Sequence, residues 1–422
     1  MTAATAECKS SGASSPAAEL SLLQLLKPEV LADPYPLYRA MREHDPVHWD
    51  PYMHTWVVTS YAEVVTVLTK YSASRTPTPE QMARMGLGVM QPFAEMLTQQ
   101  ILFMDGAAHA RLRGLCAAAF APRRVAGLRT AINEIAKELI DRVEPNGKMD
   151  VIADFANPFP AMVAAALLGF PVGDHARLKA WSTDFAELLG NFQHNPDRVK
   201  EVLRSLSELK NYVNGMLEEQ RTRPRDGLLH ELMVAEVDGG RLTDEEIVAN
   251  TIITMIGGQE TTTNLIGNGL LTLLRHPPAL RQMRDRPEIL ESAVEELLRF
   301  ESPSQHTARI APEDTQLGGK SIRKGAAVIA VMGAANRDPV RFDEPDQLDL
   351  SRQDNRHLAF GWAAHFCFGA PLARMEAQIA FRTLLGRLQE ITLVTDSMTW
   401  RGNTGLRGLS ELPVYFSTRR LN

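Results

Sequence analysis

The chain has 422 residues, of which 44% are hydrophobic and 23% charged, and its formal net charge at pH 7 is −6. This length is enough to bury a large core, either as one large domain or as two ordinary ones. The acidic balance and the lack of a basic run argue against a nucleic-acid partner. The three cysteines, Cys8, Cys116 and Cys367, are odd in number and far apart, which fits a reducing compartment better than a disulfide framework.

The first 17 residues are rich in Ala, Ser and Thr, and they contain neither a basic leader with an apolar core nor a run of about 18 apolar residues. No internal repeat or Pro/Gly/Ser-rich linker divides the remainder. We therefore expect residues 1–17 to be a flexible tail and residues 18–422 to form one domain. No membrane anchor is expected, and the protein is predicted to be cytoplasmic.

The first ordered segment is predicted to alternate helix and strand. A short helix is expected over Asp33–Arg42, two strands of a hairpin over Val47–Trp49 and Thr55–Val58, and a helix over Tyr61–Tyr71. Residues 72–104 follow with prolines, glycines, methionines and only weak periodicity. Such a long irregular segment is usually functional or mobile, although a variable surface loop is the plainer alternative.

His109 and Arg113 follow an Asp-Gly turn and are four residues apart. On a helix they share one face and could both reach an anion. By itself the pair is weak, because many helical surfaces offer such a combination by chance.

The middle of the chain is predicted to be helical, because apolar residues recur three and four positions apart. Helices are expected over 123–143, 159–168, 174–189 and 196–221. A helix stop is marked by Gly169 and Pro171.

A long helix is predicted from Thr243 to His276. Thr243 and Glu246 form a capping box, and apolar residues continue almost without interruption until two prolines end the helix. A helix of this length would span about 48 Å, enough to cross a whole domain.

The middle of this helix contains Gly257, Gly258, Glu260 and Thr261. Two adjacent glycines weaken a helix, and an acid is costly to bury, so this local inconsistency indicates a site. The glycines would let a flat group lie against the helix, and the Thr261 hydroxyl could bond to a backbone carbonyl. Glu260 and Thr261 would then be an acid and an alcohol positioned to deliver protons. The alternative is a helix crossing built from small residues.

Glu296 and Arg299 lie three residues apart on the next predicted helix, which begins near Pro287. In isolation they would be an ordinary surface ion pair. Short strands are expected around a Gly-Gly turn at 317–322 and over 327–331, and closing strands over 400–416.

Cys367 lies in the segment Phe360 to Ala370, with glycines on either side and a helix beginning at Ala370. Unpaired N–H groups and the positive end of the helix dipole favour its thiolate. A thiolate in an aromatic loop suits a soft metal ion, such as a haem iron. A buried structural cysteine is the plainer alternative.

The order of residues in this loop resembles the haem-binding signature of the cytochrome P-450 family, Phe-Gly-x-Gly-x-His/Arg-x-Cys-x-Gly. Ala363 departs from the signature, because it occupies the position of the second glycine. If that position needs a positive φ, alanine there costs strain. The matching residues are Phe360, Gly361, His365, Cys367 and Gly369.

The resemblance covers residues 18–420 and implies a fold that is mainly α with a small β region. Haem b would lie between the long central helix and the cysteine loop, with Cys367 as the metal ligand. The cofactor-binding residues would be His109, Arg113, Gly258, Arg309, His357, Phe360 and Cys367, and the catalytic residues Glu260 and Thr261. Glu296 and Arg299 would be structural, and the irregular segment 72–104 would cover the substrate pocket.

The implied activity is that of a soluble, bacterial-type haem-thiolate monooxygenase, which inserts one oxygen atom of O2 by hydroxylation or epoxidation. The substrate is expected to be bulky and largely apolar, such as a polyketide, macrolide or terpenoid intermediate of secondary metabolism. A separate ferredoxin or flavodoxin with its reductase would supply electrons, and the protein is expected to be a monomer. Candidate contacts for the redox partner are Arg113, Arg123, Arg124 and Arg374.

Three other functions would use some of the same residues. A peroxygenase would share the fold, but such relatives tend to lose the acid and alcohol pair kept here as Glu260 and Thr261. A non-catalytic haem protein would not need that pair. A cysteine hydrolase using Cys367 and His365 is disfavoured, because residues two apart in a glycine loop rarely align as nucleophile and base.

Overall fold

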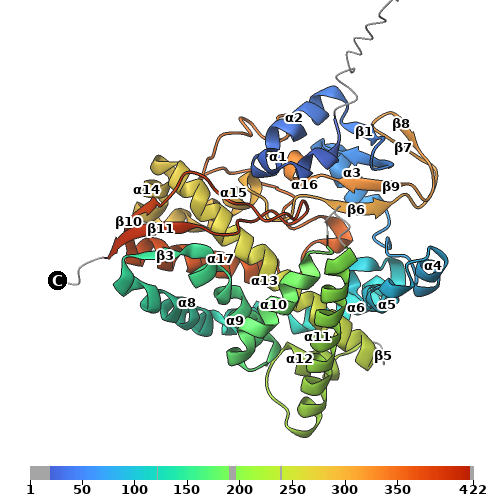
Figure 1. Ribbon diagram of the computed structural model, residues 1–422, viewed down its shortest axis with the longest axis horizontal. Helices are drawn as coiled ribbons and strands as arrows, with labels where there is room; N and C mark the ends of the chain where they lie inside the picture. The colour runs from blue at the N-terminus through green and yellow to red at the C-terminus, as the bar shows by residue number, and fades with distance from the viewer. Residues whose placement is uncertain (1–19, 121, 190–195, 238–239, 419–422) are drawn as a thin grey trace, which may run out of the picture.

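The structure is a computed structural model that describes residues 20–120, 122–189, 196–237 and 240–418. The expected tail, residues 1–17, lies outside the described residues. Within them the chain is mainly helical, with small sheets near one end and at one side (Figure 1). The mainly α fold class is therefore confirmed.

The helices of the first half mostly follow the expected ranges. The predicted helix over 123–143 is divided at Leu128, and residues 72–104 contain two short helices that periodicity did not reveal. The elements are α1 (Pro28–Ala32), α2 (Tyr35–His44), α3 (Tyr61–Lys70), α4 (Pro79–Arg84), α5 (Gln91–Thr98), α6 (Gly106–Ala119), α7 (Pro122–Gly127), α8 (Arg129–Val143), α9 (Pro158–Leu168), α10 (His175–Ala186), α11 (Pro196–Thr222) and α12 (Leu228–Val234).

The second half is built on one long helix that crosses the whole molecule (Figure 1). As predicted, the Thr243 hydroxyl caps this helix by accepting from the Glu246 N–H, while the Glu246 carboxylate accepts from the Thr243 N–H. The remaining helices are α13 (Asp244–Arg275), α14 (Pro277–Asp285), α15 (Leu290–Phe300), α16 (Met332–Ala335) and α17 (Ala370–Arg387).

A four-stranded sheet with the order β1-β2-β9-β6 packs beside the N-terminal helices. Strands β1 and β2 form the expected hairpin, whereas β2 and β9 are parallel although they lie far apart in the sequence. A Gly-Gly turn, in which both glycines have positive φ, links β7 and β8. The strands are β1 (Val47–Asp50), β2 (Thr55–Val58), β6 (Thr307–Ile310), β7 (Thr315–Leu317), β8 (Lys320–Ile322) and β9 (Ala327–Ala330).

Other short strands lie at the side of the molecule and near α12. Strand β11 pairs with both β10 and β3, and β4 pairs with β5. The expected closing strands are represented by β11, while β3 and β10 were not foreseen. Their bounds are β3 (Lys148–Asp150), β4 (Glu236–Val237), β5 (Gly240–Arg241), β10 (Leu388–Leu393) and β11 (Pro413–Thr418).

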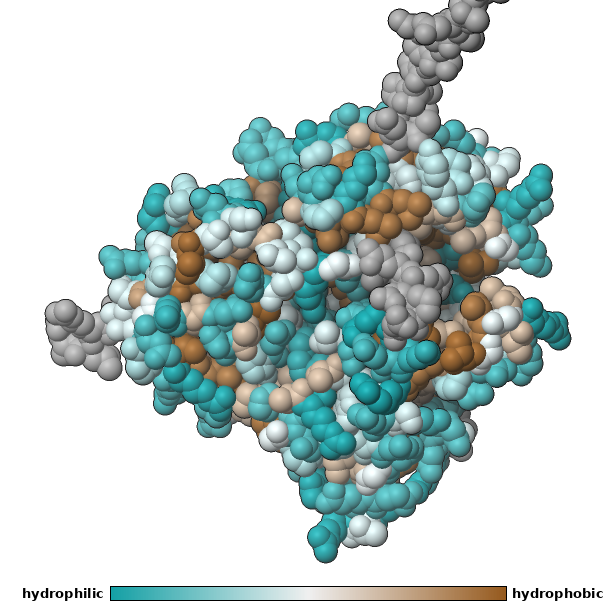
Figure 2. All heavy atoms as spheres, viewed as in Figure 1, coloured by the Kyte–Doolittle hydropathy of each residue, from teal (hydrophilic) through white to brown (hydrophobic). Residues whose placement is uncertain are grey.

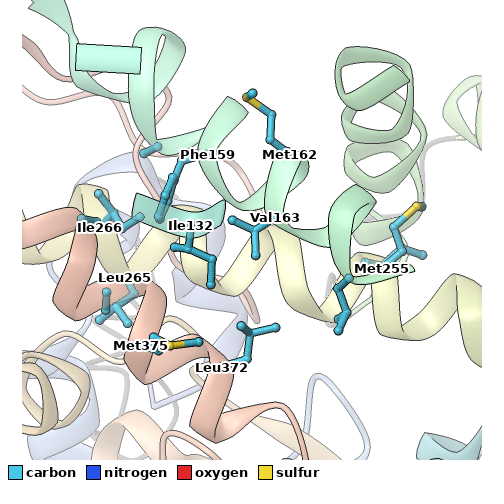
Figure 3. Close-up of a cluster of buried hydrophobic side chains, with 14 of the residues drawn as sticks. Ile132, Phe159, Met162, Val163, Met255, Leu265, Ile266, Leu372 and Met375 are labelled. Atoms are coloured by element: carbon cyan, nitrogen blue, oxygen red, sulfur yellow. The ribbon is translucent and has the colours of Figure 1, made fainter. Parts of the chain in front are cut away.

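The main hydrophobic core forms where α8, α9, α13 and α17 meet. Figure 3 shows Phe159 and Val163 of α9, Leu265 of α13 and Leu372 of α17 gathered in this core. The approach of α17 requires a small residue on α13, because a Cβ at Gly269 would lie 2.6 Å from the Phe381 ring. This packing sets how closely α13 and α17 approach each other.

The surface in Figure 2 is mostly hydrophilic, with hydrophobic patches scattered over it. None of the helices in the described part of the chain is both long and apolar enough to span a bilayer.

Candidate functional site

A cavity of about 460 Å³ lies between the middle of α13 and the cysteine loop. This volume is within the range of small-molecule sites. The predicted site residues in its wall are His109, Arg113, Gly258, Glu260, Thr261, Arg309, Phe360 and Cys367. The structure therefore brings together every predicted site residue except His357.

Cys367 is held in place by the backbone of its own loop. Its N–H donates to the Phe360 carbonyl at 2.9 Å, and the helix α17 begins three residues later. Burial raises the pKa of the Cys367 thiol and outweighs the N–H groups of Gly369 and Ala370, which act in the opposite direction. The expected donors are thus present and favour the thiolate, while burial opposes them. A bound metal cation would reverse this balance, because a coordinating thiol is deprotonated.

The loop position that departs from the signature has the unusual backbone conformation. Ala363 has a φ of 53°, in the left-handed region where glycine is favoured, and the preceding Gly361 has a φ of 72°. The strain expected for an alanine at this position is therefore present.

Gly257 and Gly258 leave the helix surface bare where α13 forms the cavity wall. A Cβ at either position would meet no atom within 4 Å, although both residues lie in the interior of a helix. Side chains there would occupy the cavity instead of displacing protein. The Thr261 hydroxyl donates to the Gly257 carbonyl at 2.7 Å, as expected.

A group of basic side chains lines the cavity beside the cysteine loop. Sequence reasoning named His109, Arg113 and Arg309, and the structure adds Arg75 and His365. The rings of His109 and His365 lie 4.2 Å apart, and the Arg75 guanidinium lies 4.5 Å from the centre of the Phe103 ring.

Asp105, whose carboxylate lies 3.4 Å from Nε2 of His365, is the carboxylate that acts on Arg75, Arg309 and the two histidines, so these basic side chains outnumber their anionic partner. Burial lowers the pKa of Arg309 to about 10, while burial and then Arg309 lower that of Arg75 to about 9. Burial, followed by His109 and Arg309, lowers the pKa of His365 to about 4. Among the described residues, Nε of Arg309 and Nε2 of His109 have no hydrogen-bond partner. The cluster is therefore electrostatically incomplete, because buried cations are stable when paired with anions.

His357 lies outside this cluster, so the structure does not place it beside the other predicted cofactor-binding residues. Its Nε2 lies 3.3 Å from the carboxylate of Glu295, and its Nδ1 accepts from the Ala359 N–H. Glu295 is also bound by Arg374 through two contacts of 2.7 Å. His365, the histidine inside the cysteine motif, is the one that reaches the cavity.

Glu260 is 1% exposed and is held by cations from two distant segments. Lys179 and Thr183 of α10 contact one carboxylate oxygen, and Arg401 donates to the other at 2.7 Å. Burial acts to raise the pKa of Glu260, but Lys179 and Arg401 outweigh it and hold the pKa below its ordinary value. The residue predicted as an acid is therefore an ionised acceptor in this arrangement.

Glu296 and Arg299 are fully buried and form a double hydrogen bond of 2.8 and 2.7 Å. Arg352 approaches the same carboxylate at 3.2 Å, and Arg299 also donates to the carbonyls of Asn336 and Pro345. The network ties α15 to the chain that leads into the cysteine loop. The predicted structural role agrees with this geometry, and the surface alternative is excluded by the burial.

Sequence reasoning missed Arg75, Lys179 and Arg401, and it left His365 without a role. Lys179 is 81 positions from Glu260, and Arg401 is 141 positions from it. No local pattern links residues so far apart. His365 is the exception, because its place in the motif carried a usable signal.

Comparison with known proteins identifies this arrangement. The family model for cytochrome P450 matches residues 49–398. The chain belongs to the cytochrome P450 family. The biotin biosynthesis cytochrome P450 of Bacillus subtilis is 36% identical over 92% of this chain and 97% of its own length. The 6-deoxyerythronolide B hydroxylase of Saccharopolyspora erythraea is 33% identical over 90% of this chain and 96% of its own.

Solved cytochrome P450 structures have the same fold. The structure of P450BioI in complex with an acyl carrier protein ligated to hexadec-9Z-enoic acid has a TM-score of 0.87 and 36% identity, over 92% of this chain and 99% of that one. The Bacillus subtilis cytochrome P450 PksS gives a TM-score of 0.83 and 33% identity over 92% and 98%. This cytochrome P450 is accordingly a monooxygenase whose family binds haem, and the recognition, the fold and the enzyme class expected from the sequence are confirmed.

The cavity of this cytochrome P450 fits a haem in three respects. Cys367 supplies a sulfur ligand, the bare surface at Gly257 and Gly258 accommodates a flat ring, and the unmatched cations suit two propionates. These features come from separate parts of the chain, so their agreement is an independent test of the fit.

Proposed function

We propose that this cytochrome P450 hydroxylates or epoxidises a bulky, largely apolar organic molecule, such as a polyketide, macrolide or terpenoid intermediate of secondary metabolism. The observation that carries the proposal is the shared cavity, in which Cys367 and Glu260 border the same apolar space. Two relatives support the substrate class, since one is a polyketide biosynthesis cytochrome P450 and another is the 6-deoxyerythronolide B hydroxylase.

In this proposal Cys367 ligates the iron of haem b, and Gly258 and Phe360 contact the flat faces of the ring. The propionates are held by His109, Arg113, Arg309, His365 and Arg75. When bound, the haem supplies the activation of dioxygen that the protein side chains cannot perform. The chain itself positions the substrate, excludes water and moves protons.

Proton movement is assigned to Glu260 and Thr261. The Thr261 hydroxyl donates its hydrogen bond to the Gly257 carbonyl, so the lone pairs of its oxygen remain as acceptors. Glu260 is ionised and paired with Lys179, whose side chain is 13% exposed. We assign proton uptake to Lys179 and Glu260, and the holding of a proton or water near the substrate to Thr261.

Electrons are proposed to come from a separate ferredoxin or flavodoxin and its reductase, docking on the cysteine side of a monomer. Of the four arginines expected there, Arg123 is exposed, whereas Arg113, Arg124 and Arg374 already contact groups within the chain. Arg123 is therefore the strongest candidate for this contact. A cytoplasmic location is supported by Cys116 and Cys367, which are both free thiols.

The first experiment is the carbon monoxide difference spectrum of the reduced protein, measured for the wild type, Cys367→Ser and Cys116→Ser. Cys116 is a matched control, because it is buried in α6 away from the cavity wall. The red-shifted Soret band typical of thiolate ligation is expected in the wild type and in Cys116→Ser, and its loss in Cys367→Ser. A band retained in Cys367→Ser would overturn the ligand assignment.

The remaining alternatives are separated by turnover. Oxygen-dependent oxidation with a ferredoxin and its reductase should fall at least tenfold in Thr261→Ala, because general acid–base groups contribute about 10²–10⁴-fold. Turnover driven only by hydrogen peroxide would indicate a peroxygenase. A protein that shows the Soret band but no turnover with several bulky apolar substrates would be a non-catalytic haem protein.

A further inference from the structure

Two polar side chains interrupt the otherwise apolar part of the cavity wall that faces α13. Ser304 and His306 lie two residues apart on the extended segment that precedes β6, and both line the cavity. Gln305, between them, points away: it donates to the Ser302 carbonyl at 2.7 Å and packs against Gly333. The alternation of an extended chain therefore presents 304 and 306 to the same side.

This segment is continuous with the wall on the Glu260 side of the cavity. Ser304 is bridged to Leu406, and the Gln305 N–H donates to the Gly405 carbonyl at 2.9 Å. The same C-terminal loop carries Arg401, which reaches Glu260. His306 accordingly belongs to the chamber that the proton-delivering residues border.

The neighbouring wall residues make this chamber suitable for an apolar skeleton. The cavity that His306 borders is also lined by Leu167, Ile253, Leu298 and Leu406. A polar group among such neighbours is costly unless it has a defined partner, so its chemistry limits what can bind.

The chemistry of His306 is fixed by burial and by one hydrogen bond. The residue is 7% exposed, and its ring donates to the backbone carbonyl of Thr404. Burial lowers its pKa to about 4, so the ring is neutral near pH 7. In a neutral imidazole, the nitrogen that does not carry the hydrogen has a lone pair and accepts a hydrogen bond.

We propose that His306 is a specificity-determining residue that accepts a hydrogen bond from a hydroxyl group on an otherwise apolar substrate. This rests on the proposed function, because it describes the molecule that the same cavity oxidises. The hydroxyl anchors one end of the skeleton at this wall, and the group to be oxidised then faces the Cys367 side of the cavity. A carbonyl or an ether of the same shape lacks the donor and leaves the imidazole acceptor unsatisfied.

The test compares cyclododecanol, cyclododecanone and cyclododecyl methyl ether, which share one bulky ring and differ in hydrogen-bond donation. Binding to the purified holoprotein is measured by calorimetry and by the Soret spin-state shift. The alcohol should bind about three- to tenfold more tightly than the other two, the value of one neutral hydrogen bond. His306→Leu should abolish this preference, and His306→Gln, which keeps an acceptor, should retain part of it. Ser304→Ala is the matched control and should leave the preference unchanged.

Each contrary result has a separate meaning. Equal binding of the three ligands to the wild type, or no binding of any, overturns the proposal, as does a preference that survives in His306→Leu. If the preference is lost in Ser304→Ala instead, the recognition belongs to the hydroxyl of that residue and the proposal is also overturned. An alcohol preference that depends on His306 in a protein lacking the red-shifted Soret band would keep this inference and remove the oxygenase function.

Discussion

Replacing Ala363 by glycine should stabilise the cysteine loop. Ala363 has a φ of 53°, and an L residue with this left-handed backbone costs roughly 1–2 kcal/mol. The substitution also increases the entropy of the unfolded chain, which offsets about 0.4–1 kcal/mol of the gain. The expected net increase in the free energy of unfolding is about 0.5–1 kcal/mol.

The neighbouring Ala364 provides a control in which the entropic effect stands alone. Both alanines are exposed, but Ala364 does not have a positive φ. Ala364→Gly should therefore lower the free energy of unfolding by about 0.4–1 kcal/mol. The difference between the two variants removes the shared entropic effect and should equal the backbone strain, about 1–2 kcal/mol.

The assay is urea unfolding followed by tryptophan fluorescence, to which the adjacent Trp362 contributes. Denaturant unfolding is preferable to heating, because 1 kcal/mol shifts the Tm of a chain of this size by only about 1 °C. Equal effects of the two substitutions, or an Ala363→Gly variant less stable than the wild type, would refute the argument that the signature departure stores strain.

Three further predictions test the core, the cavity and the pH dependence. Glu296→Ala should lower the free energy of unfolding by about 3–5 kcal/mol, because it removes the carboxylate that pairs with Arg299 and Arg352. Glu291→Ala, at an exposed position on the same helix, should change the free energy of unfolding by less than about 0.5 kcal/mol. Similar urea midpoints for the two variants would contradict the buried network. Gly258→Val should reduce the haem-to-protein ratio of the purified enzyme, because the valine side chain would fill part of the cavity. Gly215→Val, on the outside of α11, should leave this ratio unchanged. A full haem content in both variants would argue against the bare helix surface as the haem contact. Burial acts to raise the pKa of Glu295, but hydrogen bonds from Arg374 and His357 outweigh it and lower the pKa to about 2. The stability that this carboxylate contributes is therefore complete above the unfolded pKa near 4.5 and is lost as the pH falls toward 2. Urea unfolding across this window should show a loss of up to about 3 kcal/mol, reduced by solvent screening, and Glu295→Gln should show no such loss.

Local sequence patterns predicted the elements that depend on local chemistry. The capping box of Thr243 and Glu246 marked the start of α13, and the apolar period gave its length to within a residue at each end. Segments without a strong period were predicted less well. Helices α4 and α5 have few turns and lie among prolines and glycines, so neither the hydrophobic period nor the helix length could distinguish them from a loop.

The two histidines before the cysteine show the limit of motif matching. His357 and His365 both lie within ten residues of Cys367, and sequence position alone does not say which one faces the cavity. The structure distinguishes them by partner, because Glu295 reaches across from α15 to His357. Glu295, 62 positions away, thus accounts for the place of His357 outside the cavity, whereas His365 lines the cavity and its Nε2 lies 3.4 Å from the carboxylate of Asp105.

The charges around the cavity divide into two sets with different balances. On the α10 side, Lys179 and Arg401 face the ionised Glu260, so a carboxylate already pairs with both cations there. On the cysteine side, Arg75, Arg113 and Arg309 share the cavity wall with Glu376, whose pKa burial raises well above its ordinary value, so this acid does not neutralise them. A dianionic ligand would therefore be drawn to the cysteine side, and its flat ring would be left to contact the bare surface of α13. The same asymmetry keeps the Glu260 side free for a substrate whose only strong polar demand is a single hydroxyl.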